Sequence, residues 1–204
     1  MILSQLKHAT SDLHRKAEML NFKKQIVDKT LTVHQYTALL ERNFYFHSLV
    51  EKLSEQLLTP KSMDCLGFQS RIKTSYLMRD LDSLKVDYSN SPDLKKYEQQ
   101  LFHPAKIWGA LYVAEGSTLG GRFILQYLKS NNNINQVIKE FHFYQVYASK
   151  EDLMWKKFCN CLESMTSEKQ ATSILEGAKI AFNLFVKISQ DIHPQVSRIP
   201  IEIK

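Results

Sequence analysis

The sequence IWGALYVAEGSTLGG, residues 107–121, holds four of the six glycines in this chain of 204 residues. Gly109, Gly116 and Gly120 are separated by seven and four residues, so on a helix they share one face. A glycine inside a helix lowers stability by about 1 kcal/mol relative to alanine, so these glycines must serve a purpose that offsets the lost stability. Two interpretations stay open: close packing of two helices, or a bare helix surface that receives a flat ligand, with a bend at Gly120 and Gly121.

Apolar residues elsewhere in the chain also recur at helical spacing, and strand-like alternation is almost absent. Residues 141–147 are the best candidate for a strand, and they could equally be a turn of helix. The pattern predicts an all-α fold of six to eight helices in one domain, 1–204, with a core over about 3–192 and a loose tail at 193–204. The expected helices cover residues 3–20, 33–58, 62–84, 92–102, 104–130, 150–165 and 168–192.

Several of these helices carry start signals. Thr32 with Gln35, and Ser167 with Gln170, each fit a capping box. Ser91 followed by proline fits an N-cap with proline at the first helical position. Ser149 precedes two acidic residues, which the helix dipole favours in a first turn.

Composition narrows the class of protein. Hydrophobic residues are 44% and charged residues 24% of the chain, values typical of a folded protein. The longest apolar run, 107–114, is far shorter than a membrane span, and the N-terminus lacks a signal-peptide pattern. The three cysteines show no disulfide framework or zinc spacing, so we expect a protein of the reducing cytoplasm.

The net charge is +6, but the basic residues are spread along the chain. No nucleic-acid-binding motif accompanies them, so we expect no nucleic-acid partner. A mild positive field suits a dianionic small molecule or an acidic redox partner.

His14 is the histidine with the most informative surroundings. Thr10, Ser11, Ala17 and Glu18 share its helix face. A carboxylate one turn away can fix the tautomer of an imidazole and raise its basicity, as metal-ligating histidines require. A half-buried histidine capped by Glu18 is the alternative.

The chain resembles the heme oxygenase family in two stretches, one around His14 and one around the clustered glycines. Residues 6–18, LKHATSDLHRKAE, are similar to the family signature Leu-Lys-x-x-Thr-x-x-x-His-x-x-Ala-Glu, whose histidine is the proximal ligand of heme iron. Residues 109–121 are similar to the distal helix of bacterial members, including those associated with bacteriophytochromes. Residues 176–182 resemble a third segment, and the resemblance covers about residues 3–190.

The resemblance implies heme as substrate and cofactor, with His14 as the axial iron ligand through Nε2. It implies catalytic roles for His14 and for the distal residues Gly116, Ser117 and Gly120. The residues implied to bind heme are Lys7, Thr10, Ala17, Glu18, Tyr112, Gly121, Lys156 and Phe182. The matches of Lys156 and Phe182 require a gap in the alignment.

The implied reaction opens heme to biliverdin and releases carbon monoxide and ferrous iron, using dioxygen and external electrons. No nucleotide-binding glycine pattern is present, so the electrons would come from a ferredoxin, a flavodoxin or a reductase. Ser117 stands where mammalian members carry a distal aspartate, and Ser11 where a second family lysine lies near the propionates.

Other functions remain open from the sequence. The main alternative is a heme carrier or sensor with the same fold and no turnover. A di-iron relative would need Glu-x-x-His pairs, and none occurs. A thiaminase-like enzyme would need a cysteine beside a base, and a purely structural bundle is the remaining possibility.

Overall fold

The computed structural model describes residues 1–89 and 92–192, and those residues form an all-α fold without a strand. Seven of its eleven α-helices have nine residues or more, in line with the expected six to eight. The α-helices are α1 (Ile2–Leu20), α2 (Lys23–Val27), α3 (Val33–Leu57), α4 (Pro60–Leu66), α5 (Thr74–Ser83), α6 (Lys95–Leu101), α7 (Pro104–Gly116), α8 (Gly121–Lys129), α9 (Asn132–Asn135), α10 (Glu151–Met165) and α11 (Ala171–Ile192). Three 3₁₀ turns join them: η1 (Phe68–Arg71), η2 (Phe143–Gln145) and η3 (Glu168–Gln170).

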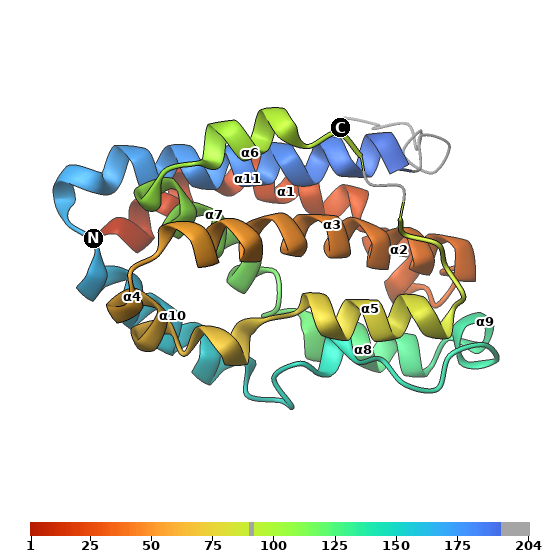
Figure 1. Ribbon diagram of the computed structural model, residues 1–204. Coiled ribbons are helices and arrows are strands. Elements are labelled where there is room, and N and C mark those ends of the chain that lie inside the picture. Colours follow the sequence, from red (N-terminus) through yellow and green to blue (C-terminus); the bar gives the residue numbers. More distant parts are fainter. Residues whose placement is uncertain (90–91, 193–204) are drawn as a thin grey trace.

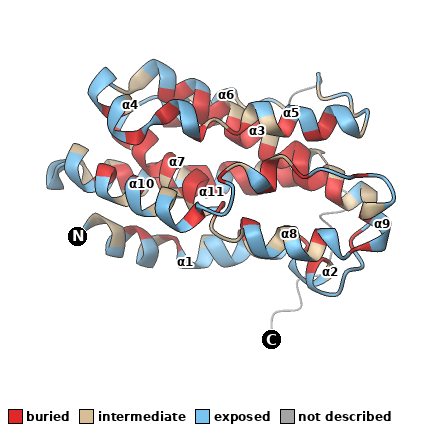
Figure 2. Cartoon of the chain, turned by 90° about the horizontal axis from the view of Figure 1, so that it is seen from below, coloured by how far each residue is buried: buried red, intermediate tan, exposed pale blue. Residues whose placement is uncertain are grey.

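Helix α3 crosses the middle of the molecule (Figure 1). In that view α11, α1 and α6 lie above it, and α5, α8, α4 and α10 lie below. Helices α7 and α1 both pack against α11, and α5 packs along α3. Buried residues concentrate on α3, α7 and α11, whereas α1 and α8 keep exposed outer faces (Figure 2).

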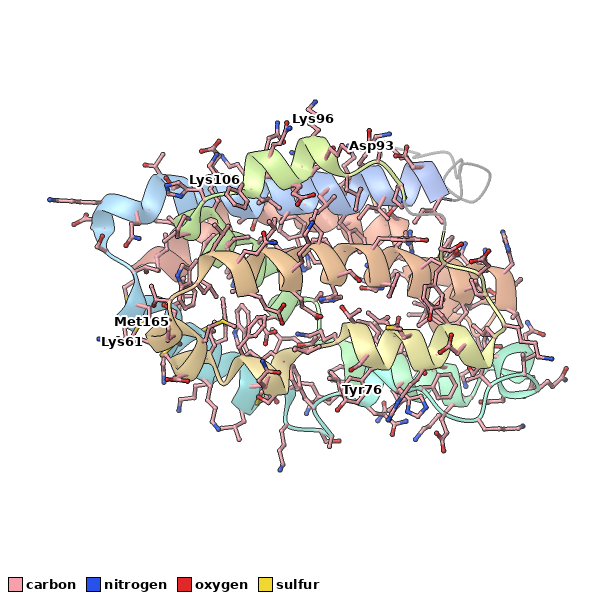
Figure 3. All side chains as sticks on the ribbon, in the orientation of Figure 1. Lys61, Tyr76, Asp93, Lys96, Lys106 and Met165 are labelled. Atoms are coloured by element: carbon pink, nitrogen blue, oxygen red, sulfur yellow. A yellow bond between two sulfur atoms is a disulfide. The ribbon has the colours of Figure 1, made fainter. Side chains whose placement is uncertain are left out.

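The crossing of α7 and α11 explains one of the four clustered glycines. A Cβ on Gly109 would lie 2.0 Å from the carbonyl oxygen of Ile174, and one on Gly177 would lie 2.0 Å from that of Lys106. The Lys106 ammonium also pairs with Glu176 across the two helices at 2.9 Å, at the place marked in Figure 3. Close packing of two helices is therefore the reason for Gly109.

Two of the expected helices are divided. The helix expected over 62–84 becomes α4, η1 and α5, because Gly67 ends α4 in the left-handed conformation at φ +58°. The helix expected over 104–130 breaks at residues 117–120, next to Gly120 and Gly121. The bend at these glycines is confirmed.

The start signals were right in part. Both capping boxes form, at Thr32 with Gln35 and at Ser167 with Gln170. The N-cap expected at Ser91 lies outside the described residues. The helix start expected at residue 92 is wrong, because α6 begins at Lys95, whose backbone N–H donates to Asp93 at 3.1 Å. Helix α10 begins one residue later than Ser149 suggests, with its acidic first turn as expected.

The expectation that the cysteines form no disulfide is also wrong. A disulfide joins Cys65 of α4 to Cys161 of α10, with their Cα atoms 5.8 Å apart. Lys61 of α4 and Met165 of α10, which are labelled near one end of the molecule in Figure 3, each lie four residues from one of these cysteines. The two cysteines are 96 residues apart in sequence, and only the packing of α4 on α10 brings them together.

Two further expectations concern the possible strand at 141–147 and membrane-spanning helices. The strand candidate at 141–147 contains the 3₁₀ turn η2, so its helical alternative is correct. None of the described helices is long and apolar enough to cross a membrane.

Candidate heme-binding cleft

A cleft of about 840 Å³ opens between α1 and the segment from α7 to α8. Its volume lies in the range of small-molecule and cofactor sites, about 300–1,000 Å³. Its lining is mostly apolar, with a few polar groups. The walls come from stretches far apart in sequence: residues 7–27, 43–46, 112–127, 155 and 182–185.

Helix α1 presents His14 to this cleft. Leu6, Thr10 and Ala17 are buried on the inner side of α1, and Thr10 donates its hydroxyl hydrogen to the Leu6 carbonyl at 2.8 Å. The ring of His14 meets Phe182 of α11 edge-on, with ring centroids 6.0 Å apart. Phe182 therefore limits how far the imidazole can turn. Within residues 1–89 and 92–192, no side-chain hydrogen bond is made by the imidazole, so its nitrogens are available to a ligand.

Glu18, expected as the partner of His14, forms an ion pair with Lys23. Its carboxylate lines the cleft one turn beyond His14, and it pairs with Lys23 of α2 at 3.4 Å. Because α1 ends at Leu20, the chain turns and brings the Lys23 ammonium toward the Glu18 carboxylate. Both side chains are largely exposed, so this ion pair contributes little to stability.

The end of α1 is tied to the central helix. Arg42 of α3 is buried, and its Nη1 donates to the carbonyl of Leu20 at 2.5 Å. Its guanidinium also lies 5.1 Å from the centre of the Phe22 ring. Burial lowers the pKa of Arg42 to about 10, so the cation persists at neutral pH. This contact fixes the helix that carries His14.

On the facing wall two glycines leave part of the backbone without side chains, and we call this part the bare wall. Gly116 and Gly120 both line the cleft. A Cβ on Gly120 would meet no atom within 4 Å, and one on Gly116 would lie 3.7 Å from the ring of Trp155. The bare-surface interpretation therefore describes Gly116 and Gly120, while close packing describes Gly109. Between them Ser117 donates its hydroxyl hydrogen to the Ala114 carbonyl at 2.8 Å, which leaves the serine oxygen as an acceptor.

The rest of the lining suits a flat ligand with an apolar body and an anionic edge. Tyr112 and Trp155 contact each other through their rings, with centroids 5.5 Å apart, and burial raises the pKa of Tyr112, which therefore stays protonated at neutral pH. Phe46 and Phe185 add aromatic surface, while Lys7 is an exposed cation on the same cleft.

Ten of the twelve site residues expected from the sequence line this cleft: Lys7, Thr10, His14, Ala17, Glu18, Tyr112, Gly116, Ser117, Gly120 and Phe182. The other two are not among its lining residues. Gly121 is buried beside the carbonyl oxygen of Tyr144, where a Cβ would lie at 3.7 Å. Lys156 is exposed on α10, and it is the preceding residue, Trp155, that lines the cleft.

Sequence reasoning missed several lining residues, among them Lys23, Asn43, Phe46, Phe123, Tyr127 and Trp155. Asn43 is a buried polar residue within α3, and its amide donates to the Leu39 carbonyl at 2.7 Å. A polar residue inside an otherwise apolar helix face was the one available signal for it.

Comparison with known proteins agrees with this geometry. A sequence model described as heme oxygenase matches residues 1–191. A heme oxygenase of Xanthomonas campestris pv. campestris (strain 8004) is 30% identical over 138 residues, which are 66% of this chain and 76% of that protein.

Two solved structures share the fold. The heme oxygenase of Leptospira interrogans has a TM-score of 0.70 at 17% identity, over 94% of this chain and 99% of that one. Heme oxygenase-1 of Synechocystis sp. PCC6803, solved in complex with heme, has a TM-score of 0.76 at 17% identity, over 96% and 93%. With the family match spanning nearly all of the sequence, the chain belongs to the heme oxygenase family of enzymes.

Proposed function

We propose that this enzyme opens heme to biliverdin, and that the whole chain forms one domain for that purpose. The observation that carries the proposal is the pairing of His14 on one wall of the cleft with the bare backbone of Gly116 and Gly120 on the other. When bound, heme would supply both the redox-active iron and the ring that is opened, yielding biliverdin, carbon monoxide and ferrous iron from dioxygen and external electrons.

The residues of the cleft fit heme chemically. His14 lines the cleft, no side chain of residues 1–89 and 92–192 is hydrogen-bonded to its ring nitrogens, and a neutral imidazole is a good ligand for iron. Lys7 places a cation on a cleft whose body is aromatic and apolar, which matches a macrocycle with carboxylate substituents. Gly116 and Gly120 let a flat ring approach the backbone closely, because no Cβ intervenes.

The electrons would come from a separate protein. We propose an acidic donor such as a ferredoxin, a flavodoxin or a reductase, supported by the net charge of +6. Opposite charge raises the rate of encounter between such partners.

A heme carrier or sensor is the second candidate, and Ser117 is the observation that favours it. The Ser117 hydroxyl hydrogen is already donated to the Ala114 carbonyl, so in this arrangement the residue can accept a hydrogen bond from water but donates none into the cleft. An enzyme would need water, held by Ser117 or by the backbone, to bring protons to this wall.

Turnover separates the two candidates. Purified protein is mixed with hemin, given a reductant in air, and followed by absorbance. We expect the Soret band to decay as a biliverdin band grows. A heme complex that survives these conditions would favour the carrier or sensor, and a protein that binds no hemin would contradict both.

Gly120→Ala tests the bare wall directly. Its Cβ meets no protein atom within 4 Å and its φ is −80°, so the free energy of unfolding should change by less than about 1 kcal/mol. A methyl group on this wall should nevertheless weaken hemin binding about tenfold, the equivalent of about 1.4 kcal/mol. Hemin titration followed at the Soret band gives the affinity.

The neighbouring variant Gly121→Ala tests the sequence-based expectation for that glycine. Its Cβ would make an ordinary contact with Tyr144 outside the cleft. Affinity equal to wild type would remove Gly121 from the binding residues, and a loss as large as that of Gly120→Ala would restore it. Wild-type affinity in both variants would contradict the bare-wall interpretation.

A further inference from the structure

Four polar side chains are buried together behind the bend between α7 and α8. Glu115, the residue before Gly116, is 2% exposed. Around it lie Arg71 at the end of η1, Lys73 at the start of α5, and Tyr147 after η2, each exposed by 5% or less. We call these four residues the Glu115 cluster. None of them lines the cleft.

Both oxygens of the Glu115 carboxylate are fully used. Arg71 pairs with Oε2, and the ammonium of Lys73 donates to Oε1 at 2.5 Å. The hydroxyl of Tyr147 lies 2.8 Å from Oε2 and donates to the same carboxylate. Burial alone would raise the pKa of Glu115, but the two cations outweigh it and lower the pKa. The carboxylate therefore stays ionised and firmly held.

The Glu115 cluster connects several helices at this point. The Nε of Arg71 donates to the carbonyl of Leu66 at the end of α4, and its Nη2 donates to that of Met154 in α10 at 3.1 Å. Trp155, which follows Met154, has its ring against Gly116. One arginine therefore links the α7 end of the bare wall to the helix that carries the aromatic ring beside it.

Stability alone does not account for such a cluster. Removing two cations and a carboxylate from water is costly, and replacing a buried ion pair by apolar residues is often neutral or stabilising. What the charges add is a fixed geometry, since each hydrogen bond has a narrow range of length and direction. Here they fix the position of the Glu115 side chain. Because Gly116 and Ser117 are the next two residues in the chain, the position of their backbone is restricted as well.

We propose that Glu115 is a positioning residue of the cleft, acting through Gly116. Held by Arg71, Lys73 and Tyr147, it fixes the distance between the bent backbone of residues 116–120 and the bound heme ring. This inference rests on the proposed function, because it assigns the cluster a role in placing the bare wall against heme.

The mildest test is Tyr147→Phe, which removes one hydroxyl and keeps all the charges. Tyr45→Phe is a matched control, since Tyr45 is also 5% exposed and donates to a backbone carbonyl, that of Tyr88, at 3.0 Å. Glu115→Gln is the stronger variant, since it keeps the shape but leaves two cations without their anion.

Two readouts separate positioning from a general loss of stability. In the ligand-free protein, amide hydrogen exchange should become at least about tenfold faster over residues 116–121 in both cluster variants and remain unchanged there in Tyr45→Phe. In the hemin complex, the carbon monoxide stretching frequency of the reduced form should shift in the cluster variants. Turnover at saturating hemin should fall about tenfold to a hundredfold in Glu115→Gln, because misplacement by about 1 Å has effects of this size.

The outcomes distinguish this inference from the proposed function. Exchange over 116–121 that matches Tyr45→Phe would overturn the positioning role, whether or not hemin binds. An unchanged carbon monoxide stretch and wild-type turnover in Glu115→Gln would overturn it as well. Faster exchange at the bend in a protein that binds no hemin would leave Glu115 as the residue that fixes the bend, and would reject heme as the ligand.

Discussion

His14→Ala is expected to abolish the normal ligation of heme and to lower turnover at least about a hundredfold. Loss of a residue that merely supports a metal ligand typically costs 10–100-fold, and here the ligand itself is removed. The Soret and charge-transfer bands should lose the signature of a histidine complex. His14 is exposed in the free protein, so the fold should remain intact.

Two additions make this experiment decisive. His8→Ala changes another exposed histidine of α1 that does not line the cleft, and it should behave as wild type. Free imidazole should restore part of the histidine-type spectrum in His14→Ala, because the deleted ring leaves room for it. An unchanged Soret spectrum in His14→Ala would contradict His14 as the iron ligand.

Gly109→Ala is expected to have the largest effect on stability. Its Cβ would lie 2.0 Å from the Ile174 oxygen and 2.5 Å from the Ala178 nitrogen, both of them backbone atoms that cannot turn away. Helices α7 and α11 would have to separate, although they share the most extensive helix contact of the fold. We expect a loss of more than about 4 kcal/mol, or no folded protein.

Chemical denaturation followed by circular dichroism measures this loss. Gly120→Ala is the matched variant, since it makes the same chemical change at a glycine with open space around it. If the two variants unfolded at the same denaturant concentration, the close crossing of α7 on α11 would be wrong.

Local signals in the sequence predicted what local interactions determine. The capping box of Thr32 and Gln35 is complete within four residues, and it forms as expected. The break after Leu66 escaped prediction because apolar periodicity continues across Gly67, and only the positive φ of that glycine ends α4. For the glycines between residues 109 and 121, the sequence allowed two interpretations, close helix packing and a bare surface. It could not assign each glycine to one of them, since that depends on which neighbour each one faces.

Contacts between segments that are distant in the chain could not be predicted from the sequence. Helical spacing placed Glu18 near His14, but it could not show that the end of α1 at Leu20 also brings Lys23 to the Glu18 carboxylate. The resemblance placed Lys156 one residue away from the lining residue Trp155, and one position on a helix turns a side chain by about 100°. The Glu115 cluster unites residues 71, 73, 115 and 147, whose spacing shows no pattern.

The residues that line the cleft are spread along the chain, and this determines when the cleft can form during synthesis. Helix α1, which carries His14, is synthesised early, but it packs against α11, which is the last of the described helices. A ribosome-bound chain can therefore present the glycine wall before the histidine wall has a surface to dock on, since domains assemble as their segments emerge. Completion of the site is set by synthesis of Phe182 and Phe185 rather than of His14. The cleft is therefore complete only after α11 has been synthesised.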